Sequence, residues 1–511
     1  MSDVKVIVRY LPQFHTVPEN DKWWGKGFTD WRSASNAESL FSGHKQPRVP
    51  QNNNYYNLLE KKTMQWQADL ALKYGIAGFA FYHYWFKDGK RLLEKPAENL
   101  LKWTDINMPF CFSWANETWA RTWSKLTNTV SWNDLEETGA ADDEDGENGI
   151  LLDQRYGKET DWIEHINYMI PFFKDPRYIR KDEHPVLIIY KPDDIACLPD
   201  MLDVWNRELG KNGIEELFVI GETFHEEPLT KSIDAIMVRF PTYGIDLTRP
   251  LMKDGVRCYD YDEMWQSLLK TDWNRYSKRK VYLCPFVDYD TTPRKGRKGD
   301  VVIGFTMEKW RRYIQDAITL SRRNGNEFLF INAWNEWGET MYMEPDEENH
   351  EEVLAAVREA LTYKGDSIYI EMDDTDILKR ENEFKKRFRA LKKREMTLQK
   401  WMSLRDKGVS VIDWLVDNGM QNIAIYGAGL MGEHLLEEAL RRDTINVRYF
   451  IDRGDIARRY PVPIIKPDVV NSGSGIDTVV VTIIEAYDDI RNELVKRGVA
   501  TVSLEHIINE L

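Results

Sequence analysis

Short apolar runs alternate with longer amphipathic segments along the first 365 residues, and this alternation limits the possible folds more than any other feature. Eight runs have the length and composition of buried strands: 4–10, 76–82, 109–114, 186–190, 217–221, 235–240, 281–287 and 328–332. Helical patterns lie among them at 58–74, 91–103, 162–173, 201–209, 262–269, 307–323 and 351–363. Repeated strand-then-helix units predict a parallel sheet, and eight strands in this pattern predict a (β/α)8 barrel of TIM type. A doubly wound open sheet is the alternative.

A charged stretch separates this region from a second one near the C-terminus. Residues 373–407 lack a strand pattern and are rich in Lys, Arg and Glu, which is typical of a helical linker. Apolar residues recur there every seven positions, so a short dimerising coiled coil is the alternative. We therefore expect a barrel over residues 1–365, a charged helical linker over 366–415, and a small Rossmann-like α/β domain over 416–511.

The expected C-terminal domain carries a glycine motif. Gly427, Gly429 and Gly432 follow a strand pattern and precede a helical one, and Asp452 ends the next strand. In dinucleotide-binding domains such glycines bring a phosphate to the helix N-terminus, while the acid binds the ribose. The domain is too short for both mononucleotide-binding halves. Two interpretations therefore stay open: a nucleotide bound at these four residues, or a glycine turn kept for packing.

The net charge of the 511-residue chain, −15, argues against nucleic acid or an anionic membrane as the main partner. No apolar run approaches the ~18 residues of a membrane helix, and the N-terminus lacks the apolar segment of a signal peptide. The four cysteines are widely spaced and lie in or near apolar runs, which is typical of reduced, buried thiols. These features predict a cytoplasmic protein without membrane insertion and leave the oligomeric state open.

The segment after the last expected strand carries the clearest chemical signal. Glu336 and Glu339 stand three residues apart in a polar turn that also holds Asn335, Trp334 and Trp337. One carboxyl group can donate a proton while the other accepts one, provided that their surroundings separate their pKa values. The neighbouring indole rings suit a hydroxyl-rich ligand such as a sugar. The alternative is a pair of solvated glutamates.

Other polar and aromatic side chains follow the remaining expected strands. In a (β/α)8 barrel the active site lies at the carboxyl ends of the strands, so these side chains would converge there. The convergence favours a catalytic role for Glu336 and Glu339 and a saccharide as the ligand. By location alone, the candidate substrate-binding residues are Trp23, Trp24, Asp30, His83, Trp85, Trp114, Asn116, Glu117, Tyr190, Glu222, Asn335 and Trp337.

Metal ligation is not indicated. His15, His83 and His184 are not spaced as ligand pairs, and the acidic stretch 134–147 does not fit the EF-hand template. A basic loop after the seventh expected strand either meets an anionic group on the substrate, as loops there often do in barrels, or is simply solvated. Its charged residues are Arg294, Lys295, Arg297 and Lys298.

Six motifs in order along the chain carry a family resemblance. They are YLPQFH from residue 10, NDKWWGKGFTDW from 20, YHYW from 82, SWANETW from 113, DTTPR from 290, and WNEWGE with the following MEP from 334. Together, over roughly residues 4–362, they resemble the WbsX-type family, which carries a glycosyltransferase label. That family in turn resembles the endo-α-mannosidases of glycoside hydrolase family 99. The glycine motif and the segment 450–452 resemble Rossmann-like modules found beside sugar-modifying enzymes.

The resemblance implies a (β/α)8 catalytic domain whose catalytic pair lies in the segment from Asn335 to Glu339. It implies that Glu336 is a base, which deprotonates the 2-hydroxyl of the sugar for attack on the anomeric carbon. It implies that Glu339 protonates the leaving oxygen and later activates water, so that configuration is retained. This scheme uses no metal, nucleotide or enzyme nucleophile.

The sequence leaves three functions open. The first is a retaining glycoside hydrolase, endo-acting on an α-linked polysaccharide of mannose or rhamnose type from a microbial source. A variant of it pairs Glu117 with Glu222 or Glu336. The second is a glycosyltransferase in the biosynthesis of cell-surface, O-antigen-like polysaccharide. The third is a saccharide-binding scaffold without catalysis.

Overall fold

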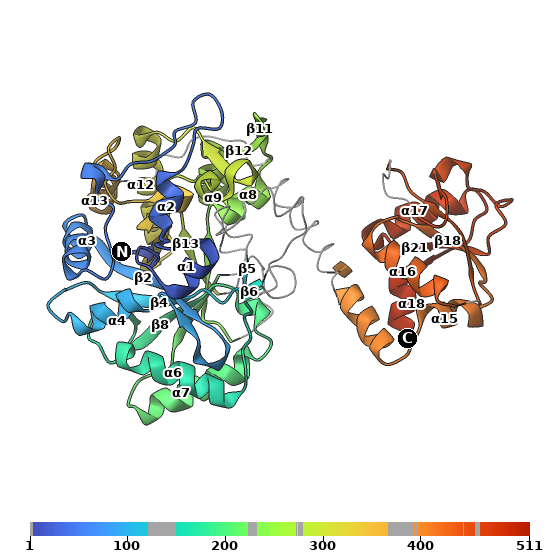
Figure 1. The fold of residues 1–511 in the computed structure, drawn as a ribbon, viewed down its shortest axis with the longest axis horizontal. Helices are drawn as coiled ribbons and strands as arrows, with labels where there is room; N and C mark the ends of the chain where they lie inside the picture. Colours follow the sequence, from blue (N-terminus) through green and yellow to red (C-terminus); the bar gives the residue numbers. More distant parts are fainter. Residues whose placement is uncertain are drawn as a thin grey trace. The chain divides into compact units, whose positions relative to one another are not determined.

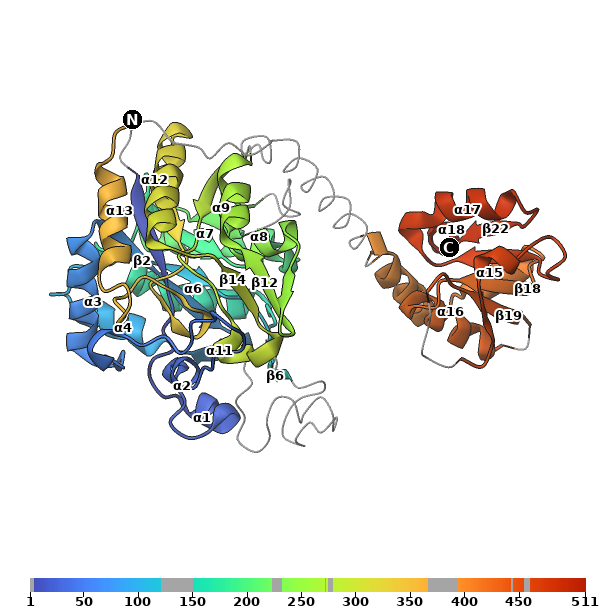
Figure 2. The same cartoon turned by 90° about the horizontal axis from the view of Figure 1, so that it is seen from above.

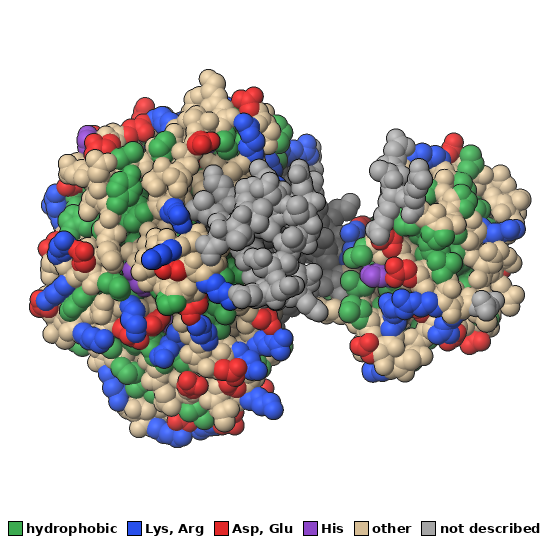
Figure 3. All heavy atoms as spheres, viewed as in Figure 1, with side chains coloured by type: hydrophobic (Ala, Val, Ile, Leu, Met, Phe, Trp, Pro, Cys, Tyr) green, Lys and Arg blue, Asp and Glu red, His purple; other side chains and the backbone are tan. Residues whose placement is uncertain are grey.

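The structure, a computed structural model, divides into two compact units, residues 1–378 and 379–511. It describes residues 4–120, 150–222, 232–271, 273, 279–365, 393–394, 396–442, 444–454 and 460–511. The acidic stretch 134–147 and most of the expected linker lie outside the described residues. Acidic and basic side chains are interspersed over the face of the first unit seen in Figure 3, so the negative charge does not form one patch there.

Eight parallel strands form the main sheet of the first unit, as the sequence predicts. Their order is β13-β10-β9-β8-β4-β2-β1-β15, and β3 and β7 pair with its members at the side. The eight strands are β1 (Lys5–Tyr10), β2 (Ile76–Trp85), β4 (Phe110–Trp114), β8 (His184–Ile189), β9 (Phe218–Glu222), β10 (Ala235–Arg239), β13 (Lys280–Cys284) and β15 (Phe328–Ile331).

The two outer strands of this order, β13 and β15, meet and nearly close the barrel. Just beyond their ends, Asn332 donates its backbone N–H to the Pro285 carbonyl at 2.8 Å, and Val287 donates to the Asn332 carbonyl at 3.3 Å. The predicted (β/α)8 barrel is therefore confirmed, and the doubly wound alternative is wrong for this unit.

Helices surround the barrel (Figure 1). The longest, α12, spans Met307–Arg323 as predicted and buries Trp310, Ile314 and Ala317, one face at helical spacing. Thr306 caps it by accepting a hydrogen bond from Lys309 N at 3.2 Å. The other large helices are α3 (Lys61–Lys73), α4 (Lys95–Lys102), α6 (Glu159–Phe173), α7 (Leu198–Lys211), α9 (Tyr261–Lys270) and α13 (Glu352–Thr362).

Two predicted boundaries are wrong by several residues. The helix expected from residue 91 begins at Lys95, because Arg91–Leu92 form β3 and pair antiparallel with the end of β2. The strand expected over 281–287 ends at Cys284. Proline at 285 cannot donate a backbone hydrogen bond to a neighbouring strand, so the ladder stops before it.

Short helices gather at one end of the barrel. Figure 2 shows α1 (Pro18–Trp24), α2 (Asp30–Ser35) and α11 (Thr292–Lys295) at the end opposite the N-terminus. Strand β1 begins near the N-terminus, so this is the end where the parallel strands finish. The functional residues of such barrels lie there.

The second unit is a five-stranded parallel sheet in the order β20-β19-β18-β21-β22. The strands are β18 (Asn422–Tyr426), β19 (Asn446–Ile451), β20 (Ile464–Ile465), β21 (Thr478–Val481) and β22 (Thr501–Ser503). Numbered along the chain, the order is 3-2-1-4-5, that of a doubly wound α/β domain. The helices are α15 (Val411–Asp417), α16 (Leu430–Leu440), α17 (Tyr487–Val495) and α18 (Leu504–Glu510). Trp401 and Leu404, which fall in the expected linker, pack in the core of this unit.

Candidate functional site

The turn after β15 is fixed to the start of the barrel. Asn335–Glu336 form β16, which pairs antiparallel with β17 (Met341–Tyr342), and the helical turn η7 (Trp337–Glu339) joins them. The buried Asn335 side chain accepts a hydrogen bond from Leu11 N at 2.8 Å and donates to the Leu11 carbonyl at 3.0 Å. This pair of bonds holds the turn against the end of β1.

One guanidinium joins both candidate catalytic glutamates. Arg294 donates through Nη2 to Glu336 Oε2 at 2.9 Å and through Nη1 to Glu339 Oε1 at 2.6 Å. Its Nη2 and Nε also donate to the two carboxylate oxygens of Asp30, at 2.8 and 3.1 Å. Asp30 is fully buried, and the Arg294 side chain is 3% exposed. The two carboxylates therefore share a rigid cationic partner.

Gly338, between the two glutamates, is placed where only a glycine fits. It donates its backbone N–H to Asp30 Oδ2 at 3.1 Å. A Cβ atom at this position would lie 2.6 Å from both carboxylate oxygens of Asp30 and 2.7 Å from Arg294 Nε. The absence of a side chain at residue 338 thus lets the Asp30–Arg294 pair approach the turn.

The two glutamates differ in their surroundings. Burial raises the pKa of Glu336 to about 7, partly opposed by Arg294 and reinforced by the charges of Glu339 and Asp30. The side chain of Glu336 is 6% exposed, whereas that of Glu339 is 24% exposed. One carboxyl group can therefore hold a proton near neutral pH, beside a second that is open to the cavity.

A cavity of about 400 Å³ opens in front of the pair. Aromatic and charged side chains dominate its wall, which suits a polyhydroxylated ligand. The lining residues are Leu11, Tyr82, Tyr84, Ala115, Glu117, Thr118, Trp119, Tyr190, Arg239, Thr242, Tyr289, Arg294, Lys295, Glu336 and Glu339.

A second buried cluster stands on the β9 and β10 part of the wall. Glu222 forms ion pairs with Arg9 and with Arg239, whose Nε lies 3.0 Å from Glu222 Oε2. Arg239 also donates to the Tyr190 hydroxyl at 2.5 Å, and its guanidinium carbon lies 4.5 Å from the centre of that ring. Glu222 thus lies behind the cavity wall, and Arg239 and Tyr190 form part of it.

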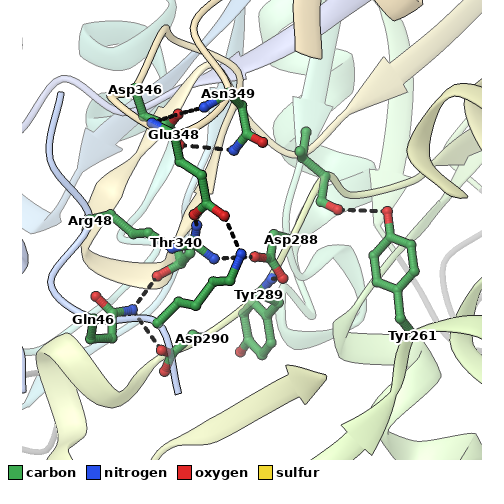
Figure 4. A network of polar contacts seen from close by, with 12 residues as sticks. Gln46, Arg48, Tyr261, Asp288, Tyr289, Asp290, Thr340, Asp346, Glu348 and Asn349 are labelled. Carbon is green, nitrogen blue, oxygen red and sulfur yellow. Dashed lines mark hydrogen bonds and ion pairs between the residues drawn. The ribbon is translucent and has the colours of Figure 1, made fainter. Parts of the chain in front are cut away.

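A polar network holds the backbone beside Glu339 (Figure 4). Asp290 donates its N–H to the Glu339 carbonyl at 2.8 Å. Gln46 donates to Asp290 Oδ2 at 2.6 Å and to the Thr340 hydroxyl at 2.7 Å. Arg48, on the same segment as Gln46, pairs with Asp288 at 2.9 Å. Two distant segments, one around Gln46 and one around Asp290, thus fix the position of Glu339.

The expected substrate-binding residues fall into three groups. Glu117 and Tyr190 line the cavity. Four residues of a second group are buried and hold either the residues that line the cavity or the turn itself: Asp30, Glu222, Asn335 and Trp337. Of these, Trp337 stacks on Tyr342 and donates a hydrogen bond to Glu344 Oε2 at 2.7 Å. The third group is buried and is not among the residues that line the cavity: Trp23, Trp24, His83, Trp85, Trp114 and Asn116.

The alternation of side chains along β2 explains the third group in part. Tyr82 and Tyr84 line the cavity, so His83 and Trp85 point to the other face of the sheet. There His83 Nε2 lies 2.9 Å from His165 Nε2, and Trp85 stacks on His165. Trp23 and Trp24 instead pack in an apolar cluster with Phe28.

Sequence reasoning missed the cationic residues of the site. Arg294 was expected only as part of a basic loop, yet it holds both glutamates, and Arg239 was not expected at all. Arg239 ends β10, so its position at a strand end was the available signal. Of the basic loop, Arg294 and Lys295 line the cavity, whereas Arg297 donates to the Asp254 carbonyl elsewhere.

The glycine motif of the second unit forms the expected strand–turn–helix. Gly427 has φ +103°, and a Cβ on Gly432 would lie 2.0 Å from the Gly427 carbonyl oxygen, so both serve the tight turn. A Cβ on Gly429 would meet no atom within 4 Å. Asp452 accepts hydrogen bonds from Ala428 N at 2.9 Å and Gly454 N at 2.8 Å. Asp452 therefore stabilises the turn itself.

Two kinds of feature are absent from the part of the chain that the structure describes. No group of three or more His, Cys, Asp or Glu side chains there has the arrangement of a metal site. No helix there combines the length and apolar character needed to cross a bilayer.

The sequence comparisons agree with the motifs. The family described as Glycosyltransferase WbsX matches residues 6–357. The chain belongs to the WbsX glycosyltransferase family. A relative named "Uncharacterized protein WxcX", from Xanthomonas campestris pv. campestris strain B100, is 34% identical over 374 residues. The match covers 70% of this chain and 49% of the relative, and a second strain carries a relative of the same name and identity. The chain thus spans about half the length of the curated relatives it matches.

Solved structures similar to this WbsX-family chain include glycoside hydrolases. A "glycoside hydrolase-like protein" is 14% identical with a TM-score of 0.45, covering 71% of this chain and 95% of its own. A glycoside hydrolase family 99 endo-α-mannosidase from Bacteroides thetaiotaomicron is 13% identical with a TM-score of 0.41, covering 71% and 97%.

Proposed function

We propose that the first unit is a retaining glycoside hydrolase that cleaves an α-linked microbial polysaccharide of mannose or rhamnose type within the chain. The observation that carries the proposal is the arrangement of Glu336 and Glu339. Two carboxylates on one turn share the guanidinium of Arg294 and line one cavity. A pair of solvated glutamates would not be fixed in this way.

The environments of the two glutamates suit different tasks. Glu336, whose pKa burial raises to about 7, is basic enough to take a proton from a sugar hydroxyl at neutral pH. Glu339 is more open to the cavity, where a leaving oxygen would receive a proton. These tasks match the roles implied by the motif resemblance, with the 2-hydroxyl of the sugar as the internal nucleophile. Arg294 would stabilise both carboxylates as their charges change.

Glutamine substitutions test the assignment. Glu336→Gln and Glu339→Gln should each lower the rate of glycan cleavage by about 10²–10⁴-fold, the usual contribution of a general acid or base. Glu117→Gln and Glu222→Gln test the alternative pairing. Near-normal cleavage by Glu336→Gln or Glu339→Gln would remove that residue from its role. Glycan binding by the wild-type protein without turnover, with little change in Glu339→Gln, would support a scaffold instead.

A glycosyltransferase is the second candidate, favoured by the family to which the chain belongs. Its defining requirement is a nucleotide-activated sugar donor. Product formation that depends on adding such a donor would favour transfer, and cleavage of a polysaccharide without a donor would favour hydrolysis.

A further inference from the structure

The cavity has an uneven distribution of charge. On the side of the catalytic turn, Arg294 faces three acidic partners, Asp30, Glu336 and Glu339. On the other side, Glu222 stands between Arg9 and Arg239 and is the one acidic partner of both among the residues that the structure describes. With all groups ionised, the first cluster carries a charge of −2 and the second a charge of +1.

The positive cluster is buried yet reaches the cavity. The side chains of Arg9 and Glu222 are 0% and 3% exposed, and that of Arg239 is 13% exposed and lines the cavity. A buried positive charge without a compensating negative one is unfavourable. The part of Arg239 that faces the cavity is therefore suited to an anion.

Lys295 adds a further cation to the same cavity. It is exposed, lines the cavity beside Arg294, and makes no ion pair with any residue that the structure describes. The neighbouring acid Glu117 is already paired with Lys191 at 2.8 Å. The Tyr190 and Tyr289 side chains also line the cavity and can supply hydroxyl groups to an oxyanion.

We infer that the substrate carries an anionic group, a carboxylate or a phosphate, and that Arg239 and Lys295 bind it while Glu336 and Glu339 face the sugar. The inference rests on the proposed function, because it names the class of glycan that the site takes. A carboxylate would belong to a uronic acid residue. A phosphate would belong to a phosphorylated glycan. The positive charges would hold the anion, whereas the two glutamates would repel it.

Binding measured by NMR with small probes tests the inference without turnover. The probes are inorganic phosphate and glucuronate, with methyl glucoside as the neutral comparator, titrated to tens of millimolar at constant ionic strength. Wild-type protein should bind at least one anion, and the tighter one identifies the source as phosphate or carboxylate. Lys295→Met and Arg239→Gln should each weaken anion binding by about tenfold or more, since each removes a charged hydrogen-bond donor.

Lys298→Met is the matched control, because Lys298 lies on the same loop but is not among the residues that line the cavity. It should bind anions like the wild type. Unchanged anion affinity in both Lys295→Met and Arg239→Gln, or no anion binding by the wild type, would overturn the inference. Loss of turnover in Glu336→Gln and Glu339→Gln would still support the hydrolase in that case. Conversely, normal turnover in those glutamine variants with anion binding lost in Lys295→Met would overturn the hydrolase and keep the anion site.

Discussion

Arg294 and Asp30 form a two-point pair beneath the turn that carries Glu336 and Glu339, with Nη2–Oδ2 and Nε–Oδ1 distances of 2.8 and 3.1 Å. This pair leaves the remaining donors of Arg294 directed at Glu336 and Glu339. Lysine cannot reproduce a planar fork of donors. We expect Arg294→Lys to fold but to lower kcat by about 10²-fold or more, as loss of a preorganised electrostatic donor does. Steady-state kinetics with circular dichroism as the folding check measures this. Arg297→Lys, outside the cavity, should keep wild-type kinetics.

Gly338→Ala should disturb the same pair from the other side. The added Cβ would lie 2.6 Å from both Asp30 carboxylate oxygens, too close for either to stay in place. We expect a destabilisation of about 1–3 kcal/mol together with a loss of activity. Gly210→Ala on α7 is the control, because its Cβ would meet no atom within 4 Å. Urea unfolding of both variants measures the difference, and equal effects would contradict the packing assigned to Gly338.

The barrel could be predicted because each of its strands is an apolar run of strand length, and the strand-then-helix order leaves few topologies. The direction of individual side chains could not. Tyr82 and Tyr84 line the cavity where His83 and Trp85 were expected. Side chains alternate between the two faces of a strand, and which set faces the cavity depends on where the strand enters the barrel. Glu336 and Glu339 could be proposed as a pair from the sequence because both stand on one turn. Arg294 lies 42 residues from Glu336 along the chain, so only the fold could show that it joins them.

The buried carboxyl group of Glu344 should make stability depend on pH. Burial raises its pKa to about 7, opposed by hydrogen bonds from Trp337, Gln67 and Tyr56. The pKa of Glu344 in the folded state lies above its ordinary value of 4.5. The contribution of this carboxyl group to the free energy of unfolding is therefore complete below pH 4.5 and is lost as the pH rises through about 7. Glu344→Gln should remove up to about 3 kcal/mol of this loss. Between pH 4.5 and pH 8, the unfolding free energy of the wild type should therefore fall by more than that of the variant. Parallel values at both pH values would contradict the buried, proton-binding state of Glu344.

The buried histidine pair should have the opposite pH dependence. Burial, with the nearby charge of Arg91, lowers the pKa of His83 to about 3, and burial also lowers that of His165. Their contribution is therefore present above the ordinary value of 6.5 and is lost as the pH falls below it. His83→Gln should reduce the fall in unfolding free energy between pH 7 and 5, which urea titrations at the two pH values measure. An unchanged slope would show that protonation of the pair does not limit stability in acid.

Alanine substitutions at the glycines of the second unit should distinguish a turn kept for packing from a nucleotide-binding site. Gly432→Ala should destabilise that unit by more than about 1 kcal/mol, because its Cβ would lie 2.0 Å from the Gly427 carbonyl oxygen. Gly429→Ala has open space and should leave stability near wild type. Equilibrium dialysis with NAD and with UDP-glucose then tests the glycine motif. Binding that is weakened in Gly429→Ala would favour a nucleotide site, and no binding by the wild type would favour a turn kept for packing.

The most direct test of the central claim is cleavage of polysaccharide without a nucleotide sugar. Purified protein is incubated with a panel of α-linked mannans, rhamnans and O-antigen polysaccharides, some of them phosphorylated or containing uronic acid. Products are read by mass spectrometry beside Glu336→Gln and Glu339→Gln. We predict shorter oligosaccharides with the wild type and none with either variant. Cleavage that persists in both variants, or products that form only after a nucleotide-activated donor is added, would contradict the account.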